Sequence, residues 1–238
     1  MSVIIPAYNE ENRLRKSLPP ARDYLQRQDF AWEVIVIDDG SSDNTAGVSE
    51  DIFAESGVRV IRNPGNRGKG YSVRQGVFAA RGEILLFSDA DFSTPVREFT
   101  KLYSALQQGY DVAIGSRSLP DSNVTVHQAW YREGMGRLFN RLVRCLVLDG
   151  FIDTQCGFKA FRKEVALPIF SKMTIDRFSF DVEFLYIARK RGLRIKEIPV
   201  EWENVLYSRV NIVRDSARML FDLFKIRWNN FRKSYDLP

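Results

Sequence analysis

Cysteine and histidine are scarce in this sequence of 238 residues. It contains two cysteines, Cys145 and Cys156, and a single histidine, His127. Two cysteines cannot form a disulfide framework, and this usage is typical of proteins from a reducing compartment. A single histidine excludes a multi-histidine metal site and removes most mechanisms that depend on an imidazole.

Long apolar segments and targeting signals are also missing. The continuous apolar runs are short, as at residues 84–87 and 145–148, whereas a transmembrane helix needs about 20 apolar residues. The first residues show neither a basic region nor a long apolar core, so no signal peptide is evident. With 45% hydrophobic residues and a net charge of +5, the chain is too apolar and too weakly charged to be disordered. These features predict a globular protein of the cytoplasm.

The first half of the chain alternates short apolar, β-rich segments with helical ones. Strands are predicted at residues 3–5, 34–37, 58–61, 84–87 and 112–114. Helices are predicted at about residues 10–28, from a cap at 41–43 to 55, and at 69–80 and 95–108. Continuous apolar strands separated by helices are typical of a mostly parallel sheet that helices cover on both faces. The predicted fold class is therefore α/β, with ligands expected at the carboxyl ends of the strands.

The second half is less regular. Residues 119–126 are predicted to form a polar loop, and helices are expected at 128–148, at 179–191 and in the last thirty residues. The segments 137–148 and 210–233 combine an apolar stripe with Arg and Lys. This pattern fits two arrangements, a helix at a membrane interface or a helix packed on the core with its basic side chains reaching solvent.

Pairs of acidic residues follow two of the predicted strands. Asp89 and Asp91 stand one residue apart after the strand at 84–87, where they could hold a divalent cation that bridges nucleotide phosphates. Asp38 and Asp39 end the strand at 34–37, where a carboxylate could accept hydrogen bonds from a base or a ribose hydroxyl. For both pairs the alternative is an ordinary solvated turn or a helix cap.

A glycine-rich segment and several basic residues are candidates for binding anions. Residues 65–70 open a predicted helix, whose free N–H groups could meet a phosphate, although neither the P-loop nor the dinucleotide-binding fingerprint is present. A flexible turn is the other interpretation. Arg117, Arg132, Lys159 and Arg162 accompany residues 153–158, and guanidinium groups suit phosphate oxygens. In a basic protein, arginine and lysine residues that are simply exposed to solvent would give the same sequence pattern.

Several of these segments, taken together, resemble the motifs of family 2 glycosyltransferases of GT-A fold. They are residues 4–10 (IIPAYNE), 36–43 (VIDDGSSD), 66–70 (NRGKG), 88–91 (SDAD), 115–117 (GSR), 153–159 (DTQCGFK) and 180–183 (FDVE). Within the family they resemble dolichyl-phosphate β-glucosyltransferases and other polyprenyl-phosphate hexosyltransferases. The resemblance runs from residue 3 to about residue 202. It implies one GT-A domain with a Rossmann-like sheet, divided into a nucleotide-sugar half (1–117), an acceptor half (118–205) and an amphipathic helical segment (206–238).

The resemblance implies roles for the matching residues. The base and ribose of a nucleotide sugar would be held by Pro6, Tyr8, Glu10, Asp38 and Asp39. Asp89 and Asp91 would bind Mg²⁺ or Mn²⁺ across the diphosphate, with Arg67 and Lys69 nearby. The acceptor phosphate would be bound by Arg117, Arg132 and Lys159. Asp91, Asp153 and Asp89 are the candidate catalytic residues.

The chemistry of a lipid phosphate qualifies the role of Asp153. A polyprenyl phosphate has a second pKa of roughly 6 and is already an anionic nucleophile at neutral pH. Asp153 could therefore orient the cations that bind the acceptor instead of acting as a general base. Positioning and neutralisation of the departing nucleoside diphosphate would then supply the main contributions, and a single displacement would invert the anomeric centre.

The donor and the acceptor are left open by the sequence. UDP-glucose is the favoured donor, although residues 92–95 (FSTP) differ from those of the eukaryotic glucosyltransferases. The alternatives are a GDP-mannose-dependent mannosyltransferase, an enzyme with a soluble or polysaccharide acceptor, and a non-enzymatic nucleotide-binding module. Nucleic acid is not an expected partner, because the acidic pairs would repel its phosphates. We expect a peripheral protein on the cytoplasmic face of a membrane, held by its amphipathic helices.

Overall fold

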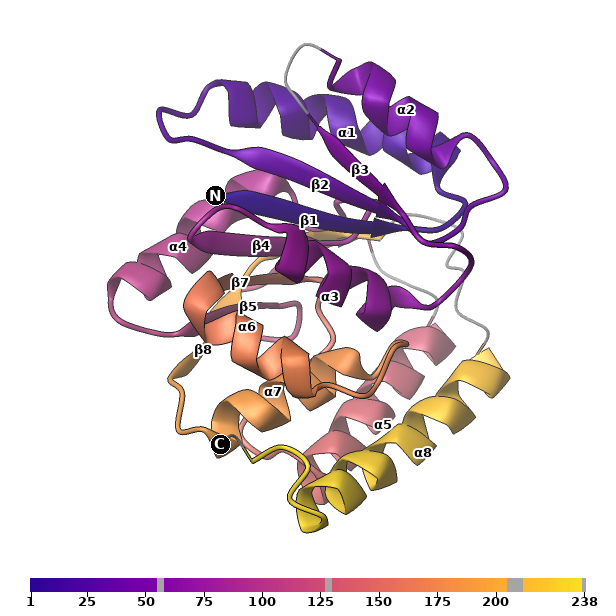
Figure 1. The fold of residues 1–238 in the computed structure, drawn as a ribbon. Coiled ribbons are helices and arrows are strands. Elements are labelled where there is room, and N and C mark those ends of the chain that lie inside the picture. The colour runs from indigo at the N-terminus through magenta and orange to yellow at the C-terminus, as the bar shows by residue number, and fades with distance from the viewer. Residues whose placement is uncertain (55–57, 127–129, 205–211, 237–238) are drawn as a thin grey trace.

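The structure is a computed structural model that describes residues 1–54, 58–126, 130–204 and 212–236, without the side chains of residues 130–133 and 212–213. Its centre is a seven-stranded sheet with the strand order β3-β2-β1-β4-β7-β5-β8 (Figure 1). The strands are β1 (Ser2–Ala7), β2 (Glu33–Asp38), β3 (Arg59–Arg62), β4 (Ile84–Ser88), β5 (Val112–Ser116), β7 (Phe158–Arg162) and β8 (Ile195–Pro199). All pairs are parallel except those of β7, which runs antiparallel between β4 and β5. The prediction of a mostly parallel α/β sheet is confirmed.

Helices cover both faces of the sheet. They are α1 (Glu11–Gln26), α2 (Thr45–Ile52), α3 (Lys69–Ala79), α4 (Phe99–Gln107), α5 (Trp130–Leu146), α6 (Lys163–Lys172), α7 (Phe180–Lys190) and α8 (Ile212–Phe231). Side chains of successive strand residues point to opposite faces, which separates two apolar cores. Val3 and Ile5 pack with α1, α2 and α4, whereas Ile4 packs with α3, α6 and α7. A strand that is buried on both faces therefore has apolar residues at consecutive positions.

The second half of the chain adds elements that the sequence does not predict. Residues 123–126 form the strand β6 (Asn123–Val126), so the predicted polar loop at 119–126 is wrong for these residues. β6 pairs in parallel with β9 (Glu201–Glu203) in a small second sheet. The antiparallel strand β7 and the helix α6 follow one another without a turn signal between them. The helices predicted at 128–148 and 179–191 correspond to α5 and α7.

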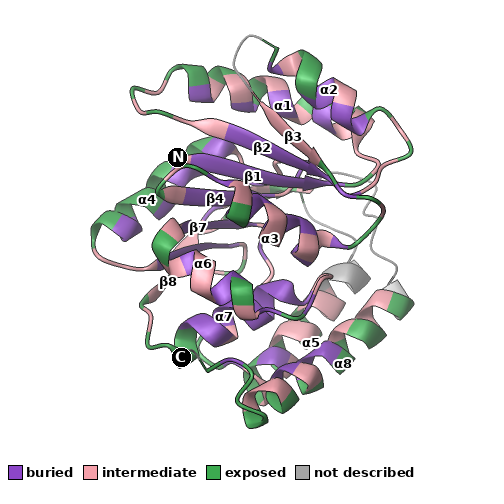
Figure 2. Ribbon diagram, in the orientation of Figure 1, coloured by how far each residue is buried: buried purple, intermediate pink, exposed green. Residues whose placement is uncertain are grey.

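The helix α8 presents its aromatic stripe to solvent. It packs on the protein through Leu223 and Ile226, which are fully buried. The apolar side chains in the predicted stripe point the other way, and those with large exposed fractions are Phe221 (69%), Phe224 (57%), Trp228 (58%) and Phe231 (78%). Figure 2 shows the exposed segments along α8, beside α5. Within the described ranges, no helix is long and apolar enough to cross a membrane.

Hydrogen bonds fix the C-terminal end of α8 to the rest of the molecule. The Lys225 Nζ donates to the carbonyl oxygen of Thr174 at 3.0 Å, and the Asn229 Nδ2 donates to the Thr174 hydroxyl at 2.9 Å. The Tyr235 hydroxyl donates to the Glu183 carboxylate of α7 at 2.7 Å. The same carboxylate accepts bonds from the backbone N–H groups of Thr174 and Ile175. The exposed stripe is thus carried on a helix whose position is fixed by hydrogen bonds to the rest of the molecule.

Candidate active site

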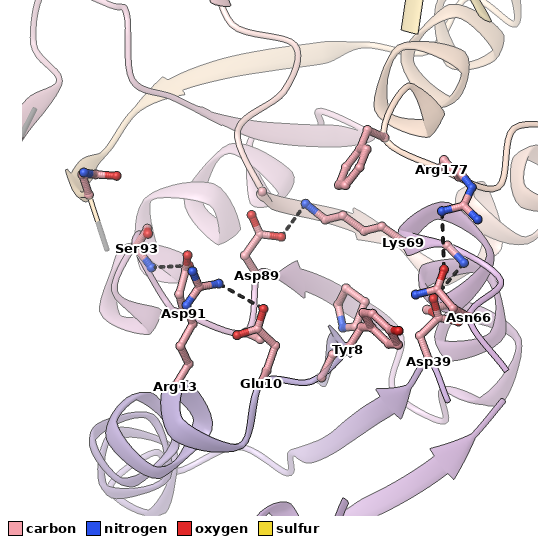
Figure 3. A pocket seen from close by; sticks show the side chains of 18 of the residues that line it. Tyr8, Glu10, Arg13, Asp39, Asn66, Lys69, Asp89, Asp91, Ser93 and Arg177 are labelled. Carbon is pink, nitrogen blue, oxygen red and sulfur yellow. Dashed lines mark hydrogen bonds and ion pairs between the residues drawn. The ribbon is translucent and has the colours of Figure 1, made fainter. Parts of the chain in front are cut away.

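A cavity of about 340 Å³ lies at the carboxyl ends of β1, β2 and β4, where the sequence places the ligand (Figure 3). The parallel register of β1 and β2 pairs Ala7 with Asp38, and so brings the residues that follow both strands to one edge of the sheet. The described residues that line the cavity are Pro6, Ala7, Tyr8, Glu10, Arg13, Asp39, Asn66, Gly68, Lys69, Ser72, Asp89, Ala90, Asp91, Ser93, Arg117, Gly157, Arg177, Phe178, Trp202 and Asn204.

The two carboxylates at the end of β2 have different partners. Asp39 lines the cavity, and its oxygens accept hydrogen bonds from the backbone N–H groups of Arg67 at 2.9 Å and Gly68 at 2.8 Å. Asp38 is fully buried, does not line the cavity, and accepts a bond from the Arg62 Nε at 2.8 Å. The structure therefore brings Asp39 to the pocket, and Asp38 joins β2 to β3.

The glycine-rich segment is shaped by Asp39 and by a turn from the second half of the chain. Gly68 has a φ of +108°, and a Cβ there would overlap the carbonyl oxygen of Asp176, so only glycine fits this approach. The N–H groups at the start of α3 point to the Asp39 carboxylate, and they help to hold this loop. Of the two basic residues predicted here, Lys69 lines the cavity, whereas the Arg67 guanidinium lies 4.7 Å from the centre of the Tyr71 ring.

Asp89 and Asp91 both reach the cavity from the end of β4. The Asp89 N–H donates to the carbonyl oxygen of Gly157 at 3.0 Å, and a Cβ at Gly157 would overlap the Asp89 carboxylate. The Lys69 Nζ lies 2.6 Å from the Asp89 Oδ1. The Asp91 Oδ1 accepts a bond from the Ser93 N–H at 3.0 Å. Glycine at position 157 therefore lets the Asp89 carboxylate sit directly against the backbone of the adjacent loop.

The carboxylate pair fits a hard divalent cation. Burial, and then the charge of Asp89, raise the pKa of Asp91. A cation between the two groups would relieve this repulsion, and carboxylate oxygens are the ligands that Mg²⁺ and Mn²⁺ prefer. Within the described ranges, no three acidic, histidine or cysteine side chains are grouped to hold a metal. A bound cation would therefore need further oxygen ligands from a phosphate and from water.

Arg117 reaches the cavity in a fixed orientation that Asp153 imposes. The Asp153 Oδ2 accepts a bond from the Arg117 Nε at 2.7 Å, and its Oδ1 accepts one from the Arg117 Nη2 at 2.9 Å. Burial raises the pKa of Asp153, but the charge and hydrogen bonds of Arg117 outweigh burial and lower the pKa below its ordinary value. Asp153 is fully buried and is not among the residues lining the cavity. This carboxylate is a poor proton acceptor and a good support for Arg117.

Of the other two residues predicted to bind the acceptor phosphate, Lys159 lies outside the cavity and the side chain of Arg132 is not described. Lys159 is 2% exposed and does not line the cavity. Its Nζ lies 2.6 Å from the Asp181 Oδ1 and donates to the Cys156 carbonyl oxygen at 2.6 Å. Arg132 belongs to the first turn of α5, but its side chain lies outside the described part of the chain.

The cavity also contains residues that the sequence does not single out. The Arg177 Nη1 donates to the Asn66 Oδ1 at 3.4 Å, and the Arg117 guanidinium lies 5.6 Å from the centre of the Trp202 ring. Asn66 belongs to the glycine-rich segment and could have been chosen from it. Arg177 comes from the turn before α7 and Trp202 from the unpredicted strand β9, so nothing local marks either residue as part of a site.

Comparison with known proteins identifies similar sequences and folds. A model of glycosyl transferase family 2 matches residues 2–170. The dolichyl-phosphate β-glucosyltransferase of Dictyostelium discoideum is 35% identical over 241 residues, covering 96% of this chain and 74% of that protein. The human dolichyl-phosphate β-glucosyltransferase is 37% identical and covers 95% of this chain and 74% of its own length.

Solved structures of other glycosyltransferases have the same fold. A complex of glucosyl-3-phosphoglycerate synthase from Mycobacterium tuberculosis with Mn²⁺, UDP and glucosyl-3-phosphoglycerate superposes with a TM-score of 0.69 at 20% identity, over 100% of this chain and 80% of that one. Mannosyl-3-phosphoglycerate synthase from Rubrobacter xylanophilus gives 0.67 at 19% identity, over 100% and 75%. At these identities the likeness concerns the fold, and the GT-A architecture is confirmed.

Replacing Asp91 by asparagine should weaken Mn²⁺ binding by at least about 100-fold, since even residues that only orient metal ligands contribute tenfold to 100-fold. The fold should survive, because Asp91 follows the end of β4, is only partly buried and belongs to neither apolar cluster. Electron paramagnetic resonance of Mn²⁺ with a nucleoside diphosphate present gives the affinity, and Asp121→Asn, on the exposed loop before β6, is the control. Equal Mn²⁺ affinity in both variants would contradict the assignment.

Proposed function

The chain belongs to glycosyl transferase family 2, and on this basis we propose that it transfers glucose from UDP-glucose to the phosphate of a dolichyl or other polyprenyl lipid. Membership of this family makes the protein a glycosyltransferase, and the curated relatives described above are dolichyl-phosphate β-glucosyltransferases. The observation that carries the proposal is a single cavity lined both by a carboxylate pair and by an arginine that Asp153 holds in place. The first suits a diphosphate with its cation, and the second suits a phosphate.

The donor would lie along the ends of β1 and β2. Pro6, Tyr8 and Asp39 are the groups proposed to hold the uracil and the ribose, since Tyr8 offers an exposed ring and Asp39 offers carboxylate oxygens. Asp89 and Asp91 would hold Mg²⁺ or Mn²⁺. When bound, this cation neutralises the charge that develops on the departing UDP. Lys69, which lines the cavity and contacts Asp89, would share in binding the diphosphate.

The acceptor phosphate would bind to Arg117. Its guanidinium is held on one edge by Asp153, so its orientation is set before the acceptor arrives. A phosphate oxygen then forms a bond to the anomeric carbon, and the bond from that carbon to the UDP oxygen breaks, with its electron pair leaving on UDP. This single displacement inverts the anomeric centre. The phosphate is already anionic near neutral pH, so no side chain needs to remove a proton.

The choice of substrates can be tested with purified protein, Mg²⁺, a polyprenyl phosphate and a set of labelled nucleotide sugars. We expect lipid-linked glucose from UDP-glucose, and loss of transfer when EDTA removes the cation. Transfer from GDP-mannose instead would make the protein a mannosyltransferase. Full activity on a soluble or polysaccharide acceptor, without lipid phosphate, would overturn the acceptor assignment while leaving the donor assignment in place.

Replacing Asp153 by asparagine should raise the KM for the lipid phosphate by about tenfold to 100-fold, because Arg117 loses a charge-assisted partner and its fixed orientation. The kcat should change little, whereas removal of a general base lowers kcat by about 10²- to 10⁴-fold. Initial rates against lipid phosphate concentration separate the two roles. The exposed Asp149→Asn is the control. A collapse of kcat with an unchanged KM would identify Asp153 as the base.

The lipid acceptor requires contact with a membrane, and we propose that α8 provides it. Phe221, Phe224, Trp228 and Phe231 form an exposed aromatic stripe on a helix that buries its other face. Exposed basic side chains accompany the stripe at Arg218, Arg227, Arg232 and Lys233. Aromatic and basic groups on one helix complement a membrane surface that contains anionic lipids.

In Figure 1 the N-terminal ends of α5 and α8 lie on the side to which the parallel strands of the sheet point. Both cysteines are free thiols, in keeping with the cytoplasmic face.

The variant Phe221→Ser/Phe231→Ser should bind anionic phospholipid vesicles at least about tenfold more weakly, since each buried phenylalanine contributes at least about 1.5 kcal/mol. Flotation with vesicles of phosphatidylcholine, with and without phosphatidylserine, measures the binding. Phe78→Ser, which removes an exposed phenylalanine from α3, is the matched control. Unchanged vesicle binding would contradict the proposal. If the double variant instead abolishes a dimer in ultracentrifugation, the stripe meets a second copy of the chain.

A further inference from the structure

A buried ion pair lies behind the cavity and has no part in the proposed transfer. Lys159 is the second residue of β7 and Asp181 the second residue of α7, and their side chains are 2% and 4% exposed. The Lys159 Nζ and the Asp181 Oδ1 are 2.6 Å apart. Neither residue is among the described residues that line the cavity. The pair therefore does not contact a ligand bound there.

Stability alone is a weak reason for such a pair. Removing two charges from water is costly, and apolar residues of similar volume often replace a buried pair without loss of stability. A buried pair is better explained when its geometry fixes something else. Here the neighbouring groups are the backbone that supports Asp89 and the lysine that contacts Asp89.

Lys159 holds the backbone against which the Asp89 carboxylate rests. Besides its contact with Asp181, the Nζ donates to the Cys156 carbonyl oxygen at 2.6 Å. The next residue is Gly157, whose carbonyl oxygen accepts the Asp89 N–H and whose missing side chain leaves room for the Asp89 carboxylate. A displacement of Cys156 would move Gly157, and with it the position of the Asp89 oxygens.

Asp181 acts on the same carboxylate from a second side, through Lys69. The Lys69 and Lys159 Nζ atoms lie 5.2 Å and 5.9 Å from the centre of the same Phe87 ring. The Lys69 Nζ contacts Asp89 at 2.6 Å, and the charge of Asp181 attracts the same ammonium group.

We propose that Asp181 and Lys159 are positioning residues that fix the Asp89 carboxylate for cation binding. Asp181 holds Lys159, Lys159 holds the Cys156 carbonyl, and Gly157 then supports Asp89. The attraction of Asp181 for Lys69 restrains the other contact of Asp89. The inference rests on the proposed function, because it assumes that Asp89 helps to bind the cation of the donor complex. It replaces direct contact with the acceptor phosphate as the role of Lys159.

The decisive variant is Asp181→Leu/Lys159→Met, which removes both charges and keeps apolar volume in their place. Its melting temperature should stay close to that of the wild type, since no unpaired ion is left. The affinity for Mn²⁺ in the presence of UDP should fall about tenfold to 100-fold, as for other residues that orient metal ligands. The affinity for UDP without metal and the KM for lipid phosphate should both be unchanged. Asp181→Asn preserves the shape and should also lower the Mn²⁺ affinity, but its melting temperature should fall because Lys159 loses its ionic partner.

Glu183→Gln is the matched control, because Glu183 is a buried carboxylate two residues further along α7. It binds Thr174 and Tyr235 instead of the groups around Asp89. This variant should lower the melting temperature and leave the Mn²⁺ affinity unchanged. An equal loss of Mn²⁺ affinity in this control would overturn the inference, because any buried charge on α7 would then have the same effect.

The remaining outcomes separate this inference from the function on which it rests. A folded double variant that binds Mn²⁺ like the wild type would overturn the positioning role and leave the transferase proposal intact. If that variant does not fold, unchanged Mn²⁺ affinity in Asp181→Asn is the overturning result. A rise in the KM for lipid phosphate alone would return Lys159 to the acceptor. A wild type that binds no Mn²⁺ in the presence of UDP would contradict the proposed donor site itself.

Discussion

The contact between the Asp89 carboxylate and the backbone of Gly157 is the constraint on which the site depends. It exists because β7 lies antiparallel beside β4, in a register that pairs Ser88 with Phe158 and so places the residues beyond both at the same edge. The first half of the chain alone would present its carboxylates to open solvent. The inserted strand closes the edge and brings Cys156 and Lys159 behind it. The segment just before the strand supplies Asp153, and with it the support for Arg117.

Two carboxylates around the cavity hold parts of the protein in place, and one of them, Asp39, also lines the cavity. Asp39 and Asp153 each accept several hydrogen bonds from donors on the protein, and each thereby fixes a loop or a cation before any ligand binds. Burial raises the pKa of Asp91, and the charge of its neighbour Asp89 raises it further. Such fixed charges need little reorganisation when charge moves from an acceptor phosphate to a leaving diphosphate.

The sequence predicts the first half of the fold well, because its strands are short, mostly apolar runs and helical segments alternate with them. It does not predict β7, whose five residues include Lys159 at a buried position. The partner of that lysine, Asp181, lies on α7, and no local pattern connects the two. Nor does the sequence tell Asp38 from Asp39, since the difference arises from Arg62 on the next strand. For α8 the periodicity identifies the helix, but Leu223 and Ile226, outside the predicted stripe, form its buried face.

The helix α8 and the start of α3 are both hydrogen-bonded to one short turn before α7. Thr174 in that turn accepts bonds from Lys225 and Asn229 of α8, the helix with the exposed aromatic stripe. Two residues later, the carbonyl oxygen of Asp176 accepts the N–H of Tyr71 in the first turns of α3. A transferase whose acceptor stays in a membrane must hold its cavity at a set height and angle to that surface. A helix tied through hydrogen bonds to the same turn as the donor loop provides such a fixed relation, because α8 and α3 cannot move independently of that turn without breaking these bonds.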